Sequence, residues 1–283
     1  VYNKWAQELD HPIMCANAID NKTGQPRFSP YTIINRNGVK IAIIGMITPA
    51  IPNWLNESLW KGMHFDGMVK CARYWMDVVK KKEHPQVIIG LFHSGRNKGI
   101  LTKEYQENAS LEVAEKVPGF DLVLYGHDHT RHIDRITDMK GGNVLCLDPS
   151  CDAYLVSDAQ IHLQMDGDKI LSKQVTGQLK DVSNEKVSDE YMAYFKAHYD
   201  SVDKFVNRKI GTFENTISTR DSYFGNSAFM DFIHYLQLQI SGAQISFAAP
   251  LTFDTKINKG DVYISDMFNL YKYENQIYVV KMS

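Results

Sequence analysis

Three short apolar runs, separated by segments of helical periodicity, constrain the fold of this chain more than any other feature. The runs are VKIAIIGMI (39–47), PQVIIGLFH (85–93) and DLVLYG (121–126). Their length, β-branched residues and flanking turn residues are typical of strands buried in a sheet. Apolar positions recur at helical spacing over residues 66–82, and a second helix is expected over residues 104–116. The order strand, helix, strand, helix, strand predicts an α/β fold.

The next part of the chain is predicted to contain two strands and then one long helix. Residues 142–149 and 153–165 carry strand patterns with no helix between them. Residues 187–208 place apolar side chains on one helical face, with Ser188 at the N-cap and the residues from Tyr191 onward facing a core. The polar stretch before this helix predicts a domain boundary.

A second unit, of α+β type, is predicted after Gly211. We expect a helix over residues 227–240 and strands over residues 243–249 and 275–282. The predicted organisation is a first domain (1–182), a linker helix (183–208) and a second domain (209–283).

Composition and charge exclude some classes of function. Of the 283 residues, 44% are hydrophobic and 23% are charged, as in ordinary globular proteins, and the formal net charge is −2. Such a chain lacks the basic surface that grips a nucleic acid polymer. No apolar run approaches the roughly 18 residues that a membrane span requires. A small anionic ligand would therefore need a local site.

The spacing of the four cysteines matches neither a zinc knuckle nor a redox pair. They are Cys15, Cys71, Cys146 and Cys151. We interpret them as buried free thiols. A Cys146–Cys151 disulfide stays open as an alternative, because Cα geometry decides it and the sequence does not supply that geometry.

Histidines stand where two of the predicted strands end. His93 closes the second apolar run, and His127 and His129 follow the third. The carboxyl ends of strands in such sheets share the edge at which α/β proteins bind ligands. In an extended stretch His127 and His129 would point to the same side and Asp128 away from it, while Gly126 would allow a sharp turn.

Neutral imidazole is a common ligand of zinc, manganese and iron, so this pattern predicts a metal site. A single histidine at a strand end is more often a hydrogen-bonded structural residue. Two such strand ends, one of them with the pattern Gly-His-X-His, favour the metal site over that alternative.

The chain resembles the calcineurin-like metallophosphoesterases, specifically the bacterial 5′-nucleotidases and 2′,3′-cyclic-nucleotide 2′-phosphodiesterases. The segments that carry the resemblance run in order along nearly the whole chain: CANAID (15–20), GVKIAIIGMITP (38–49), LFHSG (91–95), YGHDHT (125–130), ISFAAPL (245–251) and LYKYEN (270–275). The resemblance implies the second half of a metallophosphoesterase α/β sandwich, followed by a truncated α+β nucleotidase C-terminal domain.

The resemblance also implies a site with two divalent metal ions (zinc, manganese or iron), bridged by an aspartate and a hydroxide that attacks phosphorus. His93 and His127 would bind one ion and His129 the other. The family's Asp-X-His, bridging aspartate and Gly-Asn-His-Glu motifs do not occur in this sequence. They would precede Val1, and both ends are expected to be cut. We therefore expect the full-length protein to hydrolyse phosphate esters and this chain alone to be inactive.

In the second domain, the resemblance places nucleoside-binding residues in the LYKYEN segment. Tyr273 would stack on the base and Asn275 would bind its edge, with Tyr271 a weaker candidate for stacking. A tyrosine packed in a turn is the alternative. Arg220 lies where nucleotidases often keep an arginine near the substrate. Because Asp254 stands where the 5′-nucleotidase branch has an arginine, the sequence favours 2′,3′-cyclic nucleotides and 3′-nucleotides over 5′-nucleotides.

Two other functions stay open. The chain could be a nucleotide-binding module without catalysis, or His127 and His129 could form a structural site for one metal ion. The resemblance implies a periplasmic or secreted protein with a nucleotide as its partner. An uncovered sheet edge would favour self-association.

Overall fold

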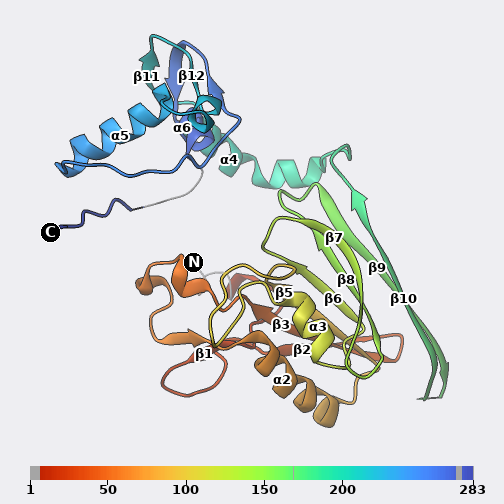
Figure 1. Ribbon diagram of the computed structural model, residues 1–283. Helices are drawn as coiled ribbons and strands as arrows, with labels where there is room; N and C mark the ends of the chain where they lie inside the picture. The colour runs from red at the N-terminus through yellow and green to blue at the C-terminus, as the bar shows by residue number, and fades with distance from the viewer. Residues whose placement is uncertain (1–6, 168, 272–275, 283) are drawn as a thin grey trace. The chain divides into compact units, whose positions relative to one another are not determined.

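We describe a computed structural model of the protein, which covers residues 7–167, 169–271 and 276–282 (Figure 1). Its contacts divide the chain into two compact units, Val1–Glu185 and Lys186–Ser283. Each unit has its own buried apolar cluster.

The first unit is built on a six-stranded sheet. In sheet order the strands are β2 (Tyr31–Arg36), β3 (Val39–Ile47), β5 (Val87–His93), β6 (Leu122–Gly126), β8 (Asn143–Pro149) and β7 (Arg131–Thr137). The four central strands are parallel, and the two edge strands are antiparallel to their neighbours. The central strands therefore end at one edge, where His93 lies opposite Ile47 on one side and Gly126 on the other.

Two helices, α2 (Met68–Glu83) and α3 (Ser110–Lys116), cover one face of this sheet (Figure 1). The buried side chains of α2 recur every three to four residues, as a helix packed on a sheet requires. Three lysines in its last turn complement the helix dipole. This layer and the sheet enclose the main core, which includes Ile44, Val79 and Val123.

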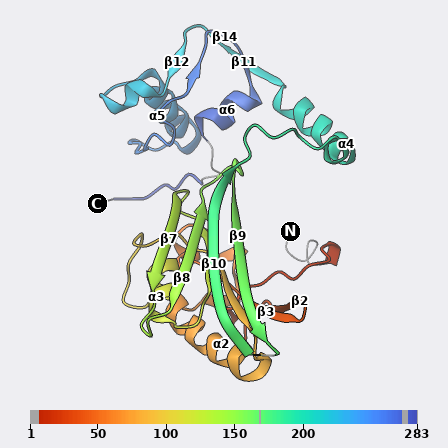
Figure 2. The same cartoon turned by 90° about the vertical axis from the view of Figure 1, so that its right-hand side faces the viewer.

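A long antiparallel ribbon, β9 (Leu155–Asp166) and β10 (Lys169–Asp181), crosses the opposite face of the sheet (Figure 2). Leu122, Leu145 and Leu147 of the sheet pack against Val175 and Leu179 of β10. The sheet is thus sandwiched between helices and a β-ribbon.

The segment between β3 and α2 forms the loops beside the carboxyl edge of the sheet. It contains the short 3₁₀ turns η1 (Ile51–Asn53) and η2 (Glu57–Leu59) and the strand β4 (Met63–Phe65). β4 pairs with β1 (Ala18–Asp20). Buried Asn17 joins these parts, because its amide bonds the backbone of both Ile47 and Asp66.

The second unit contains three helices and two small antiparallel strand pairs among its described residues. They are α4 (Asp189–Val206), α5 (Ala228–Ser241), α6 (Ile264–Leu270), β11 (Lys209–Phe213) with β14 (Gly260–Tyr263), and β12 (Ile217–Ser218) with β13 (Lys256–Ile257). Its core is small and centres on Phe229, which is fully buried. Among the residues described, no helix is both long and apolar enough to cross a bilayer.

The predicted α/β class is confirmed, as are the three strands over the apolar runs and the helices near residues 66–82 and 227–240. The helix expected over residues 104–116 is wrong in its first half, because α3 begins only at Ser110. Residues before it form a loop instead, in which the Thr102 hydroxyl bonds the backbone of Glu104 and Tyr105. Such bonds compete with helix formation.

Two further expectations fail in the second unit. Ser188 caps α4 as predicted, but no residue of α4 is buried, so the expected core contact is not formed among the described residues. The strands expected over residues 243–249 and 275–282 are absent from the described part of these segments. Their composition suits strands, but a strand also needs a hydrogen-bonded partner.

All four cysteines are free, as predicted, and Cys146 is not bridged to Cys151, but the expected burial is wrong for Cys151. Three of them are buried, and Cys151 is half-buried. Burial raises the pKa of Cys71 and of Cys146 to about 12.

Candidate functional site

The structure brings the three predicted histidines together at the carboxyl edge of the sheet. The ring centroids of His93 and His127 are 5.2 Å apart. Burial, and then the nearby imidazoles of His127 and His129, lower the pKa of His93. His93 and His129 keep substantial exposed surface, so the cluster is accessible from solvent.

The backbone at the two histidines after β6 is not extended, which corrects the sequence prediction. His127 has φ 124° and His129 has φ 57°, so both adopt left-handed conformations that are uncommon for residues with a side chain. Gly126 itself has no positive φ. The turn expected at this glycine therefore falls on the histidines, and Asp128 points toward the loop after β5 rather than away from the site.

Two residues that the sequence did not single out contact His127. Its Nε2 lies 3.0 Å from Glu107 Oε1, and the Trp54 ring is 5.2 Å away, centroid to centroid. Glu107 is held by the backbone N–H of Ile100, which donates to Oε2 at 2.7 Å. Glu107 lies in the segment wrongly predicted as helix, and no local pattern indicates its contact with a histidine 20 positions later.

A group of charged side chains lies next to the loops that carry the histidines. Arg96 binds Asp134 through two hydrogen bonds of 3.0 and 2.7 Å, and this guanidinium lowers the pKa of Asp134. Asp148 is fully buried, and burial, followed by the neighbouring carboxylate of Asp128, raises its pKa to about 7. Its Oδ1 accepts a bond from the Ser150 N–H, whereas Oδ2 has no partner among the described residues.

The donor types of this cluster suit a transition metal, because imidazole binds zinc, manganese and iron. In the part of the chain that is described, however, no group of three or more His, Cys, Asp or Glu side chains is arranged to hold a metal ion. The described histidines thus fit part of a metal site and do not by themselves complete one.

The predicted substrate-binding residues belong to the second unit. Arg220 lies on η3 (Arg220–Tyr223) and is exposed, as is Asp254. Tyr271 is half-buried at the end of α6. Tyr273 and Asn275 lie outside the described residues.

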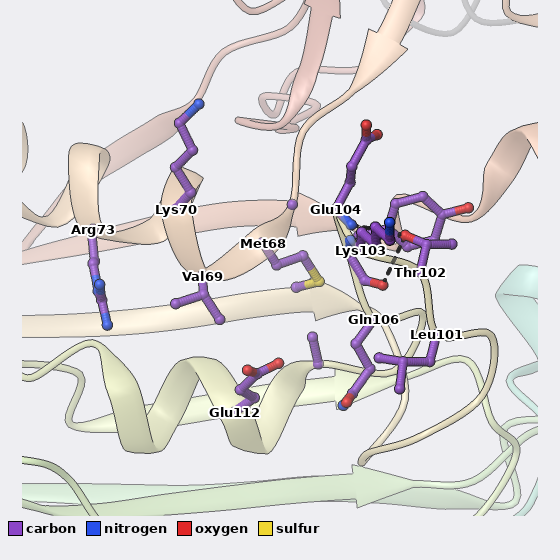
Figure 3. Close-up of a pocket in the computed structure, with 13 residues that line it drawn as sticks. Met68, Val69, Lys70, Arg73, Leu101, Thr102, Lys103, Glu104, Gln106 and Glu112 are labelled. Carbon is purple, nitrogen blue, oxygen red and sulfur yellow. Dashed lines mark hydrogen bonds between the residues drawn. The ribbon is translucent and has the colours of Figure 1, made fainter.

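A pocket of about 490 Å³ lies elsewhere on the first unit, between the start of α2, residues 101–106 and the start of α3 (Figure 3). Three basic side chains line it, those of Lys70, Arg73 and Lys103, together with the acidic side chains of Glu104 and Glu112. Charges of both signs do not favour a phosphate group, and none of the three histidines lines this pocket.

Comparison with known proteins identifies a matching domain family and several relatives. Residues 209–283 match the 5′-nucleotidase, C-terminal domain. The trifunctional nucleotide phosphoesterase protein YfkN of Bacillus subtilis is 24% identical over 97% of this chain and 21% of its own length. A 2′,3′-cyclic-nucleotide 2′-phosphodiesterase/3′-nucleotidase of Haemophilus influenzae is 23% identical over 97% of this chain and 48% of its own. The chain thus spans less than half the length of these relatives.

Solved structures give the same result for the fold. A putative 5′-nucleotidase from Staphylococcus aureus superimposes with a TM-score of 0.76 at 18% identity, covering 96% of this chain and 52% of that one. The chain therefore carries a 5′-nucleotidase C-terminal domain at residues 209–283 and has the fold of the calcineurin-like 5′-nucleotidases, and its relatives are nucleotide phosphoesterases.

Proposed function

We propose that the protein carrying this chain hydrolyses phosphate esters of nucleotides with the help of two divalent metal ions. The observation that carries the proposal is the convergence of His93, His127 and His129 at the carboxyl edge of the sheet. The relatives, which are named as nucleotide phosphoesterases, support the class of reaction.

In this proposal His93 and His127 bind one metal ion, and His129 binds the other. Bound divalent ions lower the pKa of water and neutralise the charge of phosphate oxygens. Glu107 holds the ring of His127 in its orientation, as carboxylates commonly do for histidines that bind metals. The ring of Trp54 lies at a tilt beside the same imidazole.

The three proposed ligands are all imidazoles. A pair of metal ions also needs a bridging carboxylate, and none of these ligands supplies one. Imidazoles alone do not hold a metal pair, so the 283 residues by themselves are expected to show negligible phosphatase activity. Robust metal-dependent turnover by this chain would contradict that expectation.

The preferred substrates in this proposal are 2′,3′-cyclic nucleotides and 3′-nucleotides. Tyr273 stacks on the base, Asn275 binds its edge and Arg220 lies near the phosphate. Support comes from the Haemophilus relative, whose name states both activities. Hydrolysis of 5′-nucleotides is the second candidate, since residues 209–283 match the 5′-nucleotidase, C-terminal domain.

The test compares hydrolysis of 2′,3′-cyclic AMP, 3′-AMP and 5′-AMP by the intact protein with added manganese or zinc. We expect release of product from the first two substrates, and loss of turnover after His129→Ala. The variant His162→Ala, on exposed strand β9, is the matched control and should keep full turnover. A protein that hydrolyses none of the three with either metal would contradict the proposal and favour a non-catalytic nucleotide-binding module.

The proposal also covers the cellular location of the protein and its association state. Nucleotide hydrolases of this kind would act in the periplasm or outside the cell. Self-association through the outer edge of β2 is also proposed, because that edge of the sheet has no strand partner among the described residues. A monodisperse monomer in solution would contradict it.

A further inference from the structure

Asp128, the residue between the two histidines after β6, connects the two loops that carry the site. Its Oδ2 accepts a hydrogen bond of 2.6 Å from the backbone N–H of Arg96, three residues beyond His93. Its Oδ1 accepts bonds from the N–H and the hydroxyl of Thr130, at 3.2 and 2.7 Å. One carboxylate therefore joins the loop after β5 to the loop after β6.

The packing around Asp128 shows how close this connection is. A Cβ atom at Gly95 would lie 2.5 to 2.6 Å from the Asp128 side chain, so only glycine fits there. The glycine of the first motif, His93-Ser94-Gly95, thus leaves room for the aspartate of the second motif, His127-Asp128-His129.

The backbone beside Asp128 is strained on both sides, with φ 124° at His127 and φ 57° at His129. Such conformations are unfavourable for residues with a side chain and persist only where their surroundings hold them. Asp128 lies between the two strained residues and makes three hydrogen bonds.

We propose that Asp128 is a positioning residue that holds His127 and His129 in their left-handed backbone conformations and in register with His93. Without its carboxylate, the turn after β6 would relax toward an ordinary conformation and the rings of His93 and His127 would separate. The inference rests on the proposed function only where the histidine cluster is interpreted as a metal site. The hydrogen bonds of Asp128 and the backbone conformations of the two histidines do not depend on a metal.

The matched control is Asp138, in the turn between β7 and β8. Its Oδ1 accepts bonds from the N–H groups of Lys140 and Gly142, at 2.8 and 2.9 Å. A Cβ at Gly142 would lie 2.5 Å from Asp138 Oδ2, which reproduces the arrangement at Gly95. β7 runs away from the histidines for seven residues, so this turn lies about 20 Å from them.

The test measures ring-to-ring contact by NMR in the chain with labelled histidine. The wild type should show a nuclear Overhauser cross-peak between the rings of His93 and His127, whose centroids are 5.2 Å apart. Asp128→Ala should lose this cross-peak, while Asp138→Ala should keep it even if both variants lose similar stability. A cross-peak of wild-type intensity in Asp128→Ala would overturn the proposal, and so would its equal loss in both variants.

If Asp128→Ala does not fold, Asp128→Asn supplies the same test. Asparagine has the same shape but one acceptor oxygen, so either the Arg96 or the Thr130 side must lose its bond. The cross-peak should weaken, and an unchanged cross-peak would overturn the proposal.

A second measurement separates this inference from the proposed function. Zn²⁺ titration of the intact protein should show affinity lowered about 10- to 100-fold in Asp128→Asn, the range typical for residues that orient metal ligands. If the wild-type protein binds no Zn²⁺ but the cross-peak still depends on Asp128, the positioning role stands and the metal site fails. If Zn²⁺ binds equally well to both proteins and the cross-peak is unchanged, the positioning role fails alone.

Discussion

At the scale of single residues, the buried carboxyl group of Asp148 beside the histidine cluster has a strongly raised pKa. It is fully buried, one of its oxygens has no partner among the described residues, and its pKa is raised to about 7 by burial and by Asp128. An ordinary aspartate in the unfolded chain has a pKa of about 4. The folded protein therefore binds a proton here that the unfolded chain has released.

This difference gives a prediction for the pH dependence of stability. Between about pH 4 and pH 7 the unfolded chain loses its proton first, so the contribution of Asp148 to the free energy of unfolding falls as pH rises. Its full size is at most about 4 kcal/mol. Asp148→Asn cannot ionise, keeps an acceptor for Ser150 and can donate toward Asp128. We expect the variant to match the wild type near pH 4 and to be more stable than it at pH 8.

Urea unfolding at several pH values checks this, followed by tryptophan fluorescence because all four tryptophans lie in the first unit. The relevant quantity is the difference in the free energy of unfolding between variant and wild type, because the contributions of the other carboxylates cancel in it. A difference that does not grow from pH 4 to pH 8 would show that Asp148 ionises normally.

The residues of the site were only partly predictable from the sequence. His93, His127 and His129 stood out because each lies at the end of an apolar run, which is a local signal. Glu107 and Trp54 contact His127 from separate loops, and nothing within either loop indicates that contact. The role of Asp128 was not predicted, because an extended backbone was expected there, in which this side chain points away from the histidines. In the structure His127 and His129 are left-handed instead.

At the scale of elements, the packing of β10 on the sheet depends on Gly177. A Cβ at this position would lie 2.9 Å from methyl groups of both Leu145 and Leu147, and 3.1 Å from the carbonyl oxygen of Asp158. Valine normally favours a strand over glycine. The close approach reverses that expectation here.

We predict that Gly177→Val lowers the free energy of unfolding of the first unit by about 1–3 kcal/mol, as other overpacked cores do. The control is Gln174→Val on the same strand, where the side chain is exposed and the change should be neutral or slightly stabilising. Urea unfolding followed by tryptophan fluorescence measures both. Stabilisation by Gly177→Val would mean that β10 does not lie against the leucines.

Sequence patterns predicted the strands buried on both faces of the sheet, and the strand pattern of residues 153–165 also predicted β9, which is partly exposed. Strands β3, β5 and β6 are continuous apolar runs, and that pattern is visible without knowledge of neighbours. The edge strands β2 and β7 and the exposed strand β10 carry mixed polar sequences, so no pattern marked them. Residues 243–249 show the converse, an apolar segment that is not a strand.

At the scale of the whole molecule, the described residues form two units with separate cores of different size. The core of the first unit is extensive, whereas the second unit centres on Phe229 with Ile217, Ile257 and Leu270. A small core gives lower stability because stability grows with the buried apolar area. We expect calorimetry to show two transitions, with the second unit unfolding at the lower temperature.

Phe229→Ala assigns the transitions. Loss of a fully buried phenylalanine typically costs about 3–5 kcal/mol, which should remove the lower transition and leave the upper one in place. Tryptophan fluorescence, which reports on the first unit alone, should be unchanged. A single transition that shifts as a whole would show that the two units unfold together.

Metal analysis of the intact purified protein, together with single alanine variants of the three histidines, tests the central claim most directly. The account predicts two divalent ions per wild-type protein, a loss of bound metal in His93→Ala, His127→Ala and His129→Ala, and full retention in His162→Ala. A wild-type protein that takes up no zinc, manganese or iron, or three variants that bind as much metal as the wild type, would contradict it. One tightly bound ion per protein would also contradict the proposed pair and would indicate a mononuclear structural site.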